Sequence, residues 1–203
     1  MTQAMRVITA KAVFDGVNLL SNKAVLIADG VIIDLIDKDK VYDATQIEDF
    51  GNSVISAGLI DLQLNGNGGV LFNDSISFAS LETMHQTNLR FGTTSYLPTL
   101  ITSDLNDVRT ALEVTKEWFK QYGNTRGVIG LHLEGPFLSK EKRGIHPLEF
   151  VTLPTDAMLI EIASYTKYFP IKLTLAPENF KPEQIAYLVK HGVIVSVGHT
   201  NAS

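Results

Sequence analysis

The residues best suited to metal chemistry follow two apolar segments of the chain. Glu134 comes directly after the apolar run of residues 127–133, and His199 follows the run VIVSV and one glycine. Carboxylate and imidazole groups are ligands of zinc and of other divalent ions. At equivalent ends of parallel strands, they would form part of a metal site. The residues alone also fit a turn carboxylate paired with Arg143 and a hydrogen-bonded histidine at a strand end.

Further polar residues lie near these two positions. Gln63 and Asn65 are two residues apart, so a strand would place both on one face. Amides are weak metal ligands, so we expect Gln63 to contact water or substrate. His146 lies in the basic segment KRGIHP, which fits either an anionic substrate or a solvated loop. His132 would share a strand face with Glu134, either as a partner of the site or as a core histidine.

The elements that would position these side chains alternate between strands and helices after about residue 55. Leu105 to Tyr122 has the period of an amphipathic helix, with Ser103 as a possible cap and Gly123 at its end. Pro182 suits the first turn of a later helix. Five apolar runs are predicted strands buried on both faces of a parallel sheet: SAGLIDLQLNG, TTSYLPTLI, GVIGLHLEG, IKLTLAPE and VIVSVGHT. This alternation favours a TIM-type barrel or a doubly wound sheet.

The first 55 residues have a different, all-β pattern. Residues 23–37 predict two strands around Asp29-Gly30, a pair that suits a tight hairpin turn. The sequence therefore predicts two domains, residues 1–55 and residues 56–203. The second holds 203 − 55 = 148 residues, about five βα units, whereas a closed barrel has eight units and about 250 residues. A barrel built from this chain alone would be incomplete.

Composition narrows the class of protein. The chain has 203 residues, of which 45% are hydrophobic, and a net charge of −5, which disfavours a broad nucleic-acid interface. It has no cysteine, which excludes disulfides and thiolate metal sites. No apolar run approaches the roughly 20 residues that a membrane helix needs. We therefore expect a cytoplasmic protein that binds neither membranes nor nucleic acid.

Several segments together carry a resemblance to a known family. GLIDLQLNGNGG, TTSYLPTL, HLEGPFL, KRGIHP, LAPE and VSVGHTNAS occur in the order and spacing typical of it. Over essentially its whole length the chain resembles the N-terminal part of the N-acetylglucosamine-6-phosphate deacetylases of the amidohydrolase superfamily. The resemblance implies part of a (β/α)8 barrel, with the N-terminal strands of a small β-sandwich domain. It also implies hydrolysis of N-acetylglucosamine 6-phosphate to glucosamine 6-phosphate and acetate.

The resemblance also implies roles for individual residues. Glu134 and His199 would bind one divalent metal ion, with zinc or iron expected, and Ile145 and His146 would contact the substrate. Many amidohydrolases have His-x-His at the end of the first strand, whereas this chain has Gln63-Leu64-Asn65. That departure suggests a mononuclear site in which Gln63 is at most a neighbour of the metal or its water.

The same resemblance places the remaining metal-binding histidine and the catalytic aspartate beyond Ser203. No catalytic base is therefore assigned within this chain, and the chain alone is expected to have little activity. A homodimer is a further expectation from the family. Two alternatives stay open at this point. One is another amidohydrolase that acts on a cyclic amide or an amino sugar, and the other is an inactive fragment that binds a sugar phosphate.

Overall fold

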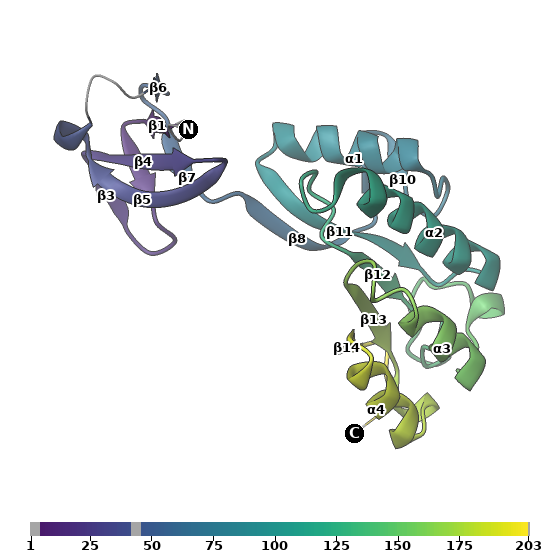
Figure 1. Cartoon of the computed structure of the whole chain (residues 1–203). Coiled ribbons are helices and arrows are strands. Elements are labelled where there is room, and N and C mark those ends of the chain that lie inside the picture. The colour runs from purple at the N-terminus through teal and green to yellow at the C-terminus, as the bar shows by residue number, and fades with distance from the viewer. Residues whose placement is uncertain (1–4, 42–45, 203) are drawn as a thin grey trace. The chain divides into compact units, whose positions relative to one another are not determined.

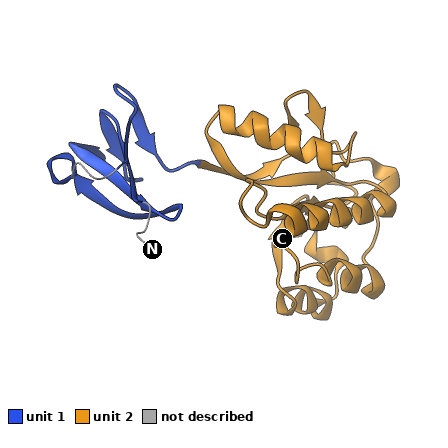
Figure 2. Cartoon of the chain, turned by 45° about the horizontal axis from the view of Figure 1, so that its top comes forward, with its two compact units in different colours: residues 1–58 blue, residues 59–203 orange. Residues whose placement is uncertain are grey.

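The structure is a computed structural model that describes residues 5–41 and 46–202 of the chain. It divides into two compact units, Met1–Gly58 and Leu59–Ser203, shown separately coloured in Figure 2. The division falls within a few residues of the change of sequence pattern at residue 55.

The first unit contains β-strands and one short 3-10 helix within the described residues. One sheet has the strand order β5-β4-β1-β6 and the other has the order β3-β2-β7. The predicted hairpin is confirmed, because β4 and β5 pair in antiparallel fashion and Asp29 and Gly30 between them have φ of 50° and 78°. The elements are β1 (Met5–Thr9), β2 (Ala12–Phe14), β3 (Leu19–Ser21), β4 (Lys23–Ala28), β5 (Val31–Asp37), η1 (Lys38–Lys40), β6 (Gln46–Asp49) and β7 (Val54–Ser56).

The second unit is built on a five-stranded sheet with the order β14-β13-β12-β11-β8, counted over the described part of the chain. Every neighbouring pair in it is parallel, as the alternating pattern predicted. The strands are β8 (Leu59–Leu64), β11 (Thr93–Ile101), β12 (Leu131–Glu134), β13 (Ile171–Leu175) and β14 (Val193–Val197). A mixed α/β unit with a parallel sheet is therefore present.

Helices follow the strands and lie on one side of this sheet (Figure 1). They are α1 (Phe78–Arg90), α2 (Leu105–Tyr122), α3 (Asp156–Ala163) and α4 (Pro182–Lys190), with 3-10 turns η2 (Leu148–Phe150) and η3 (Pro177–Asn179). A small hairpin of β9 (Gly66–Asn67) and β10 (Val70–Leu71) follows β8. Within the described ranges, no helix combines the length and the apolar character needed to cross a membrane.

Helix α2 illustrates how the sequence sets an element. Asp104, rather than the predicted Ser103, is its N-cap, since the Asp104 carboxylate accepts from the backbone N–H groups of the second and third helical residues. The helix ends at Gly123, which has a φ of 55°. The face that it buries includes Leu112 and Trp118, both fully buried.

The two faces of the parallel sheet differ in polarity. Strand β12 is buried at every residue, as predicted, whereas β8 and β14 have exposed residues and depart from the prediction of strands buried on both faces. On β12, Leu131 and Leu133 belong to the hydrophobic core that the helices cover. The alternate residues His132 and Glu134 point the other way, because successive side chains of a strand take opposite faces. Thr174, which pairs with Glu134, continues this polar face on β13. The sheet therefore presents a row of polar groups on the face away from the core.

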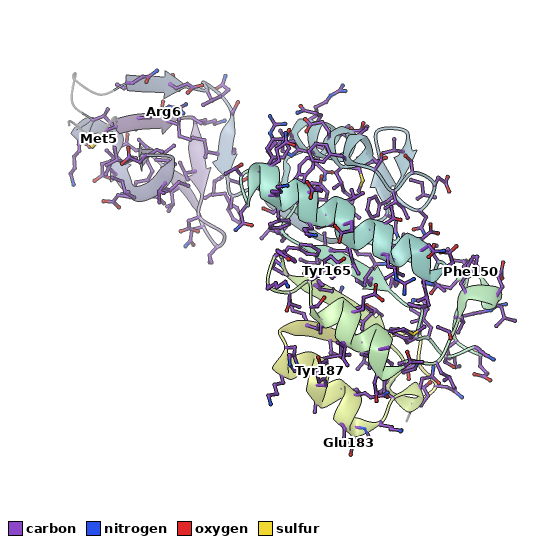
Figure 3. All side chains as sticks on the ribbon, turned by 45° about the vertical axis from the view of Figure 1, so that its right-hand side comes forward. Met5, Arg6, Phe150, Tyr165, Glu183 and Tyr187 are labelled. Atoms are coloured by element: carbon purple, nitrogen blue, oxygen red, sulfur yellow. The ribbon has the colours of Figure 1, made fainter. Side chains whose placement is uncertain are left out.

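A side-chain hydrogen bond joins the segment between α3 and β13 to helix α2. Tyr165, labelled in Figure 3, lies just after α3, and its hydroxyl donates to the carboxylate of Glu113 on α2. This hydrogen bond, with burial as the larger cause, raises the pKa of Tyr165 to about 12. The contact joins the segment that leads into β13 to the neighbouring helix.

Candidate metal centre

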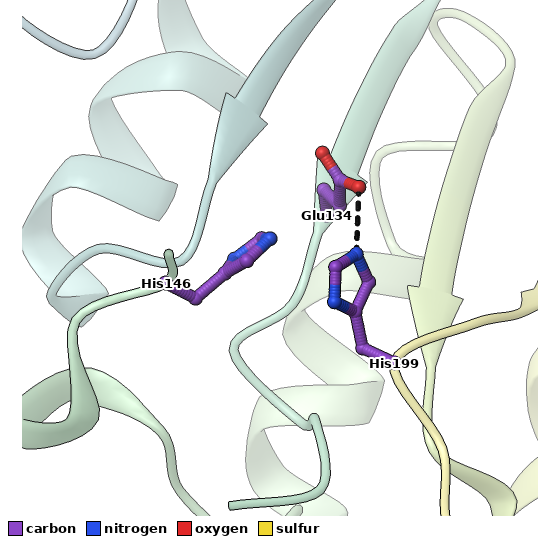
Figure 4. Close-up of side chains that lie close together, drawn as sticks. All are labelled: Glu134, His146 and His199. Atoms are coloured by element: carbon purple, nitrogen blue, oxygen red, sulfur yellow. Dashed lines mark hydrogen bonds and ion pairs between the residues drawn. The ribbon is translucent and has the colours of Figure 1, made fainter. Parts of the chain in front are cut away.

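Glu134 and His199 meet where β12 and β14 end. Glu134 is the last residue of β12 and is 7% exposed, and His199 follows β14 by two residues. Nε2 of His199 lies 3.1 Å from Oε1 of Glu134, as the dashed line in Figure 4 marks. Strand β13 lies between β12 and β14 in the sheet, so the two side chains reach each other across its carboxyl end.

The other ring nitrogen of His199 determines what Nε2 can do. Nδ1 lies 3.3 Å from the backbone oxygen of Lys142, and a carbonyl oxygen can only accept. Nδ1 therefore carries a proton, and in the neutral ring Nε2 presents a lone pair to a carboxylate oxygen. Two acceptors at 3.1 Å repel unless the ring is protonated or a cation lies beside both. A carboxylate oxygen and an imidazole nitrogen with a free lone pair are atoms that bind metal ions, so the pair fits a metal site.

His146 brings a second imidazole to the same place. Its ring centroid lies 4.5 Å from that of His199, and Figure 4 shows it on the opposite side of the site. One ligand atom from each of Glu134, His146 and His199 lies within 4.8 Å of the others. Within the described residues, this carboxylate and these two imidazoles fit a divalent cation by type and by spacing.

The hydrogen bonds of His146 differ from those of His199. The backbone N–H of Thr102 donates to Nδ1 of His146 over 3.3 Å, and the Thr102 hydroxyl lies 2.9 Å from the same atom. A lone pair on Nδ1 leaves the proton of the neutral ring on Nε2. Burial, and then the nearby His199, lower the pKa of His146 despite the opposing effect of Glu134. The neutral ring therefore offers an N–H donor to the site.

Gln63 fixes the second oxygen of the Glu134 carboxylate. Its Nε2 donates to Oε2 of Glu134 over 3.0 Å, and Gln63 lies near the end of β8, the edge strand on the other side of β12 from β14. The amide thus contacts the candidate ligand Glu134, whereas its predicted contact with the metal or its water stays a prediction. Arg143 donates to the backbone oxygen of Gly144, so its predicted alternative pairing with Glu134 is not found.

His132 lies two residues before Glu134 on β12 and is buried on the same polar face of the sheet. It is fully buried, and its ring nitrogens lie 3.2 Å from the hydroxyl of Thr99 and 2.8 Å from that of Thr174. Burial first, and then the charge of Lys172, lower the pKa of His132 from 6.5 to about 4, against the opposing effect of Glu134. Of the two roles considered for it, the satisfied core histidine matches these contacts.

The remaining predicted positions divide into exposed and structural ones. Ile145 is 89% exposed, beside the buried His146. The glycine loop after Asn65 forms the β9–β10 hairpin, and a Cβ on Gly66 would lie 2.2 Å from the backbone oxygen of Val70. Close packing of backbone on backbone explains that glycine.

Sequence reasoning missed two residues that orient the site, Thr102 and Lys142. Thr102 directly follows β11, as Glu134 ends β12. The strand-end rule that found Glu134 could therefore have found Thr102. Lys142 acts through its backbone oxygen, which no residue type reveals.

Comparisons with known proteins point to one family of enzymes. No protein-family model matches the chain. It is 38% identical to N-acetylglucosamine-6-phosphate deacetylase of Haemophilus influenzae over 92% of the chain and 48% of that protein. It is 37% identical to N-acetylgalactosamine-6-phosphate deacetylase of Shewanella sp. (strain ANA-3), over 95% of the chain and 48% of that protein. The crystal structure of N-acetylglucosamine-6-phosphate deacetylase from Pasteurella multocida matches with a TM-score of 0.90 and 39% identity, over 98% of the chain and 52% of that structure.

The fold and these likenesses together define the class, which is that of the amino-sugar-phosphate deacetylases. Within that class, the chain belongs to the N-acetylglucosamine-6-phosphate deacetylase family. It spans about half the length of the curated relatives it matches.

Proposed function

We propose that the protein formed by this sequence removes the acetyl group of N-acetylglucosamine 6-phosphate, giving glucosamine 6-phosphate and acetate. The observation that carries the proposal is the meeting of a carboxylate and an imidazole at two strand ends, with Nε2 of His199 3.1 Å from Oε1 of Glu134 and His146 close to both. Oxygen and nitrogen atoms so placed are the ligands that a divalent cation takes in proteins. The relatives from Haemophilus influenzae and Pasteurella multocida, which are named for this deacetylation, supply the substrate.

The proposal includes the architecture around the site. Residues 56–203 are the first five βα units of a (β/α)8 barrel, and residues 1–55 are strands of a small β-sandwich domain. The all-parallel order of the five strands and the helices on one side of the sheet support the barrel. The two sheets of the first unit, each of which mixes antiparallel and parallel pairs, support the sandwich.

Glu134 and His199 would hold one divalent ion, and nitrogen and oxygen donors of this kind suit zinc or iron. Such an ion, when bound, lowers the pKa of a water ligand and polarises an amide carbonyl. Gln63 keeps the Glu134 carboxylate in place, and the backbone oxygen of Lys142 keeps the lone pair of His199 directed inward.

His146 and Ile145 belong to the substrate side of the proposed site. The N–H on Nε2 of His146 would donate to an oxygen of the bound sugar phosphate, whereas Ile145 offers an exposed apolar surface beside it. The family resemblance puts the proton-transferring aspartate beyond Ser203, so the residues described here bind and orient. The resemblance also supports a cytoplasmic homodimer.

Three variants of the protein test these assignments. Glu134→Gln should weaken metal affinity by more than about 100-fold and abolish acetate release, because a ligand oxygen is replaced by an amide nitrogen or a neutral oxygen. His146→Gln should keep its metal and raise KM. Glu149→Gln is the control, since Glu149 is exposed on η2. Unchanged metal content in Glu134→Gln would refute the ligand assignment, and metal loss in His146→Gln would make His146 a ligand.

A second substrate is favoured by one comparison. The Shewanella relative, at 37% identity, is named for N-acetylgalactosamine 6-phosphate, the epimer of the proposed substrate at one hydroxyl. Acetate release from both 6-phosphates, and from the unphosphorylated sugars, separates the two. A kcat/KM at least about 10-fold higher for the galacto epimer would replace the proposed substrate.

A further inference from the structure

The segment that carries His199 needs support on both sides. His199 has a φ of 50°, in the left-handed region that costs a non-glycine residue about 1 kcal/mol. Before it, the backbone N–H of Gly198 donates to the oxygen of Leu175 over 3.1 Å and so extends the ladder between β13 and β14. At His199 itself, the backbone oxygen accepts from the N–H of Ser139 over 2.9 Å. Neither contact holds the residues that follow.

Glu178 supplies the support after His199. It lies on η3, directly after β13, and its Oε2 accepts from the Thr200 hydroxyl over 2.5 Å. Its Oε1 accepts from the backbone N–H of Asn201 over 2.6 Å. Both carboxylate oxygens therefore accept hydrogen bonds from the two residues that follow His199. We call Glu178, Thr200 and Asn201 together the Glu178 clamp.

Within the described residues, the Glu178 carboxylate forms hydrogen bonds but no ion pair. No basic group forms an ion pair with it there, although the side chain is exposed and lysines are present on neighbouring segments. Burial opposes ionisation, but the hydrogen bonds from Thr200 and Asn201 outweigh it, and the pKa of Glu178 is lowered. The carboxylate is thus the form that the two donors select.

We propose that Glu178 is a positioning residue that holds the His199 segment, so that Nε2 of His199 faces Glu134. The strained backbone of His199 is fixed before it by the sheet and after it by the clamp. Removing the clamp leaves the segment after His199 without these two hydrogen bonds, while the contacts of His199 itself with Lys142, Ser139 and Glu134 remain. The consequence for metal binding rests on the proposed function, whereas the hold on the segment does not.

The test compares Glu178→Ala and Glu178→Gln with the control Glu183→Gln, an exposed glutamate on α4 (Figure 3). Hydrogen exchange of residues 198–202 in metal-free protein should be about 10-fold faster in Glu178→Ala, with the melting temperature unchanged. Zinc affinity, measured by competition with a chelator, should fall about 10- to 100-fold. Glu178→Gln retains one acceptor oxygen and should lie between the alanine variant and the unmodified protein. The control should match the unmodified protein in every measurement.

Two results would overturn the proposal. One is unchanged exchange of residues 198–202 in Glu178→Ala, because the clamp would then hold nothing. The other is faster exchange with unchanged zinc affinity, because the contact would then support the loop without positioning His199. If the unmodified protein binds no zinc, the proposed metal site fails instead, and the exchange measurement still decides whether the clamp holds the segment.

Discussion

His132 should make the stability of the second unit depend on acid. Its pKa is 6.5 in the unfolded chain and about 4 in the fold, where burial disfavours the charged ring. Because the folded pKa is the lower one, the stabilisation is fully present above pH 6.5 and is lost as the pH falls towards 4. At about 1.4 kcal/mol for each pH unit between 6.5 and about 4, the loss is about 3 kcal/mol. The ring is fully buried, so solvent hardly screens this effect.

The assay uses the single tryptophan of the chain. Trp118 lies fully buried on α2, so its fluorescence reports on the second unit. Urea unfolding would be followed from about pH 7.5 to about pH 4, with a chelator present, in the unmodified protein and in His132→Gln. Glutamine can hydrogen-bond both Thr99 and Thr174 but does not titrate in this range.

The unmodified protein should lose about 3 kcal/mol more than His132→Gln over this range. His85 and His146 also have lowered pKa values, chiefly through burial, but they contribute equally in both proteins. An NMR titration of the His132 ring should give a pKa of about 4. Parallel loss of stability in the two proteins, or a ring that titrates near 6.5, would refute the reasoning.

Two further predictions concern packing. Leu112→Ala, at a fully buried position of α2, should lower the free energy of unfolding in urea by about 3 kcal/mol. The control Leu89→Ala, at a position on α1 that is 48% exposed, should lower it by less than about 1 kcal/mol. Equal losses in the two variants would contradict the placement of the core. Gly66→Ala should lower the free energy of unfolding by about 1–3 kcal/mol, because its Cβ would lie 2.2 Å from the backbone oxygen of Val70. In the control Gly69→Ala the new Cβ meets no atom and only the strain of the positive φ acts. A smaller loss in Gly66→Ala than in this control would show that the hairpin can shift.

Much of the fold followed from local patterns. The bounds of α2 were predicted from its period and its flanking cap and glycine, because its buried face repeats over 18 residues. The turn at Asp29-Gly30 followed from the need for positive φ at both positions. The cap of α2 was misplaced by one residue, because Ser103 and Asp104 can both accept hydrogen bonds and only the backbone geometry selects between them.

The candidate site was only partly predictable for a related reason. Glu134 and His199 are marked by their place at strand ends, which sequence reveals. The partners of a ring nitrogen depend on backbone atoms of distant segments, such as the Thr102 N–H and the Lys142 oxygen. These contacts join residues 44 and 57 positions apart, and no periodicity connects them. The Glu178 clamp is of the same kind, because it crosses from the end of β13 to the segment after β14.

These backbone contacts explain why two neighbouring imidazoles can take different roles. Both rings lie beside Glu134, and residue type alone would make both of them metal ligands. The Lys142 oxygen requires a proton on Nδ1 of His199, so Nε2 is an acceptor atom available to a cation. The Thr102 N–H requires a lone pair on Nδ1 of His146, so Nε2 of that ring is a donor. In the proposed site, two main-chain groups rather than the histidines themselves would therefore decide which ring binds the metal and which contacts the substrate.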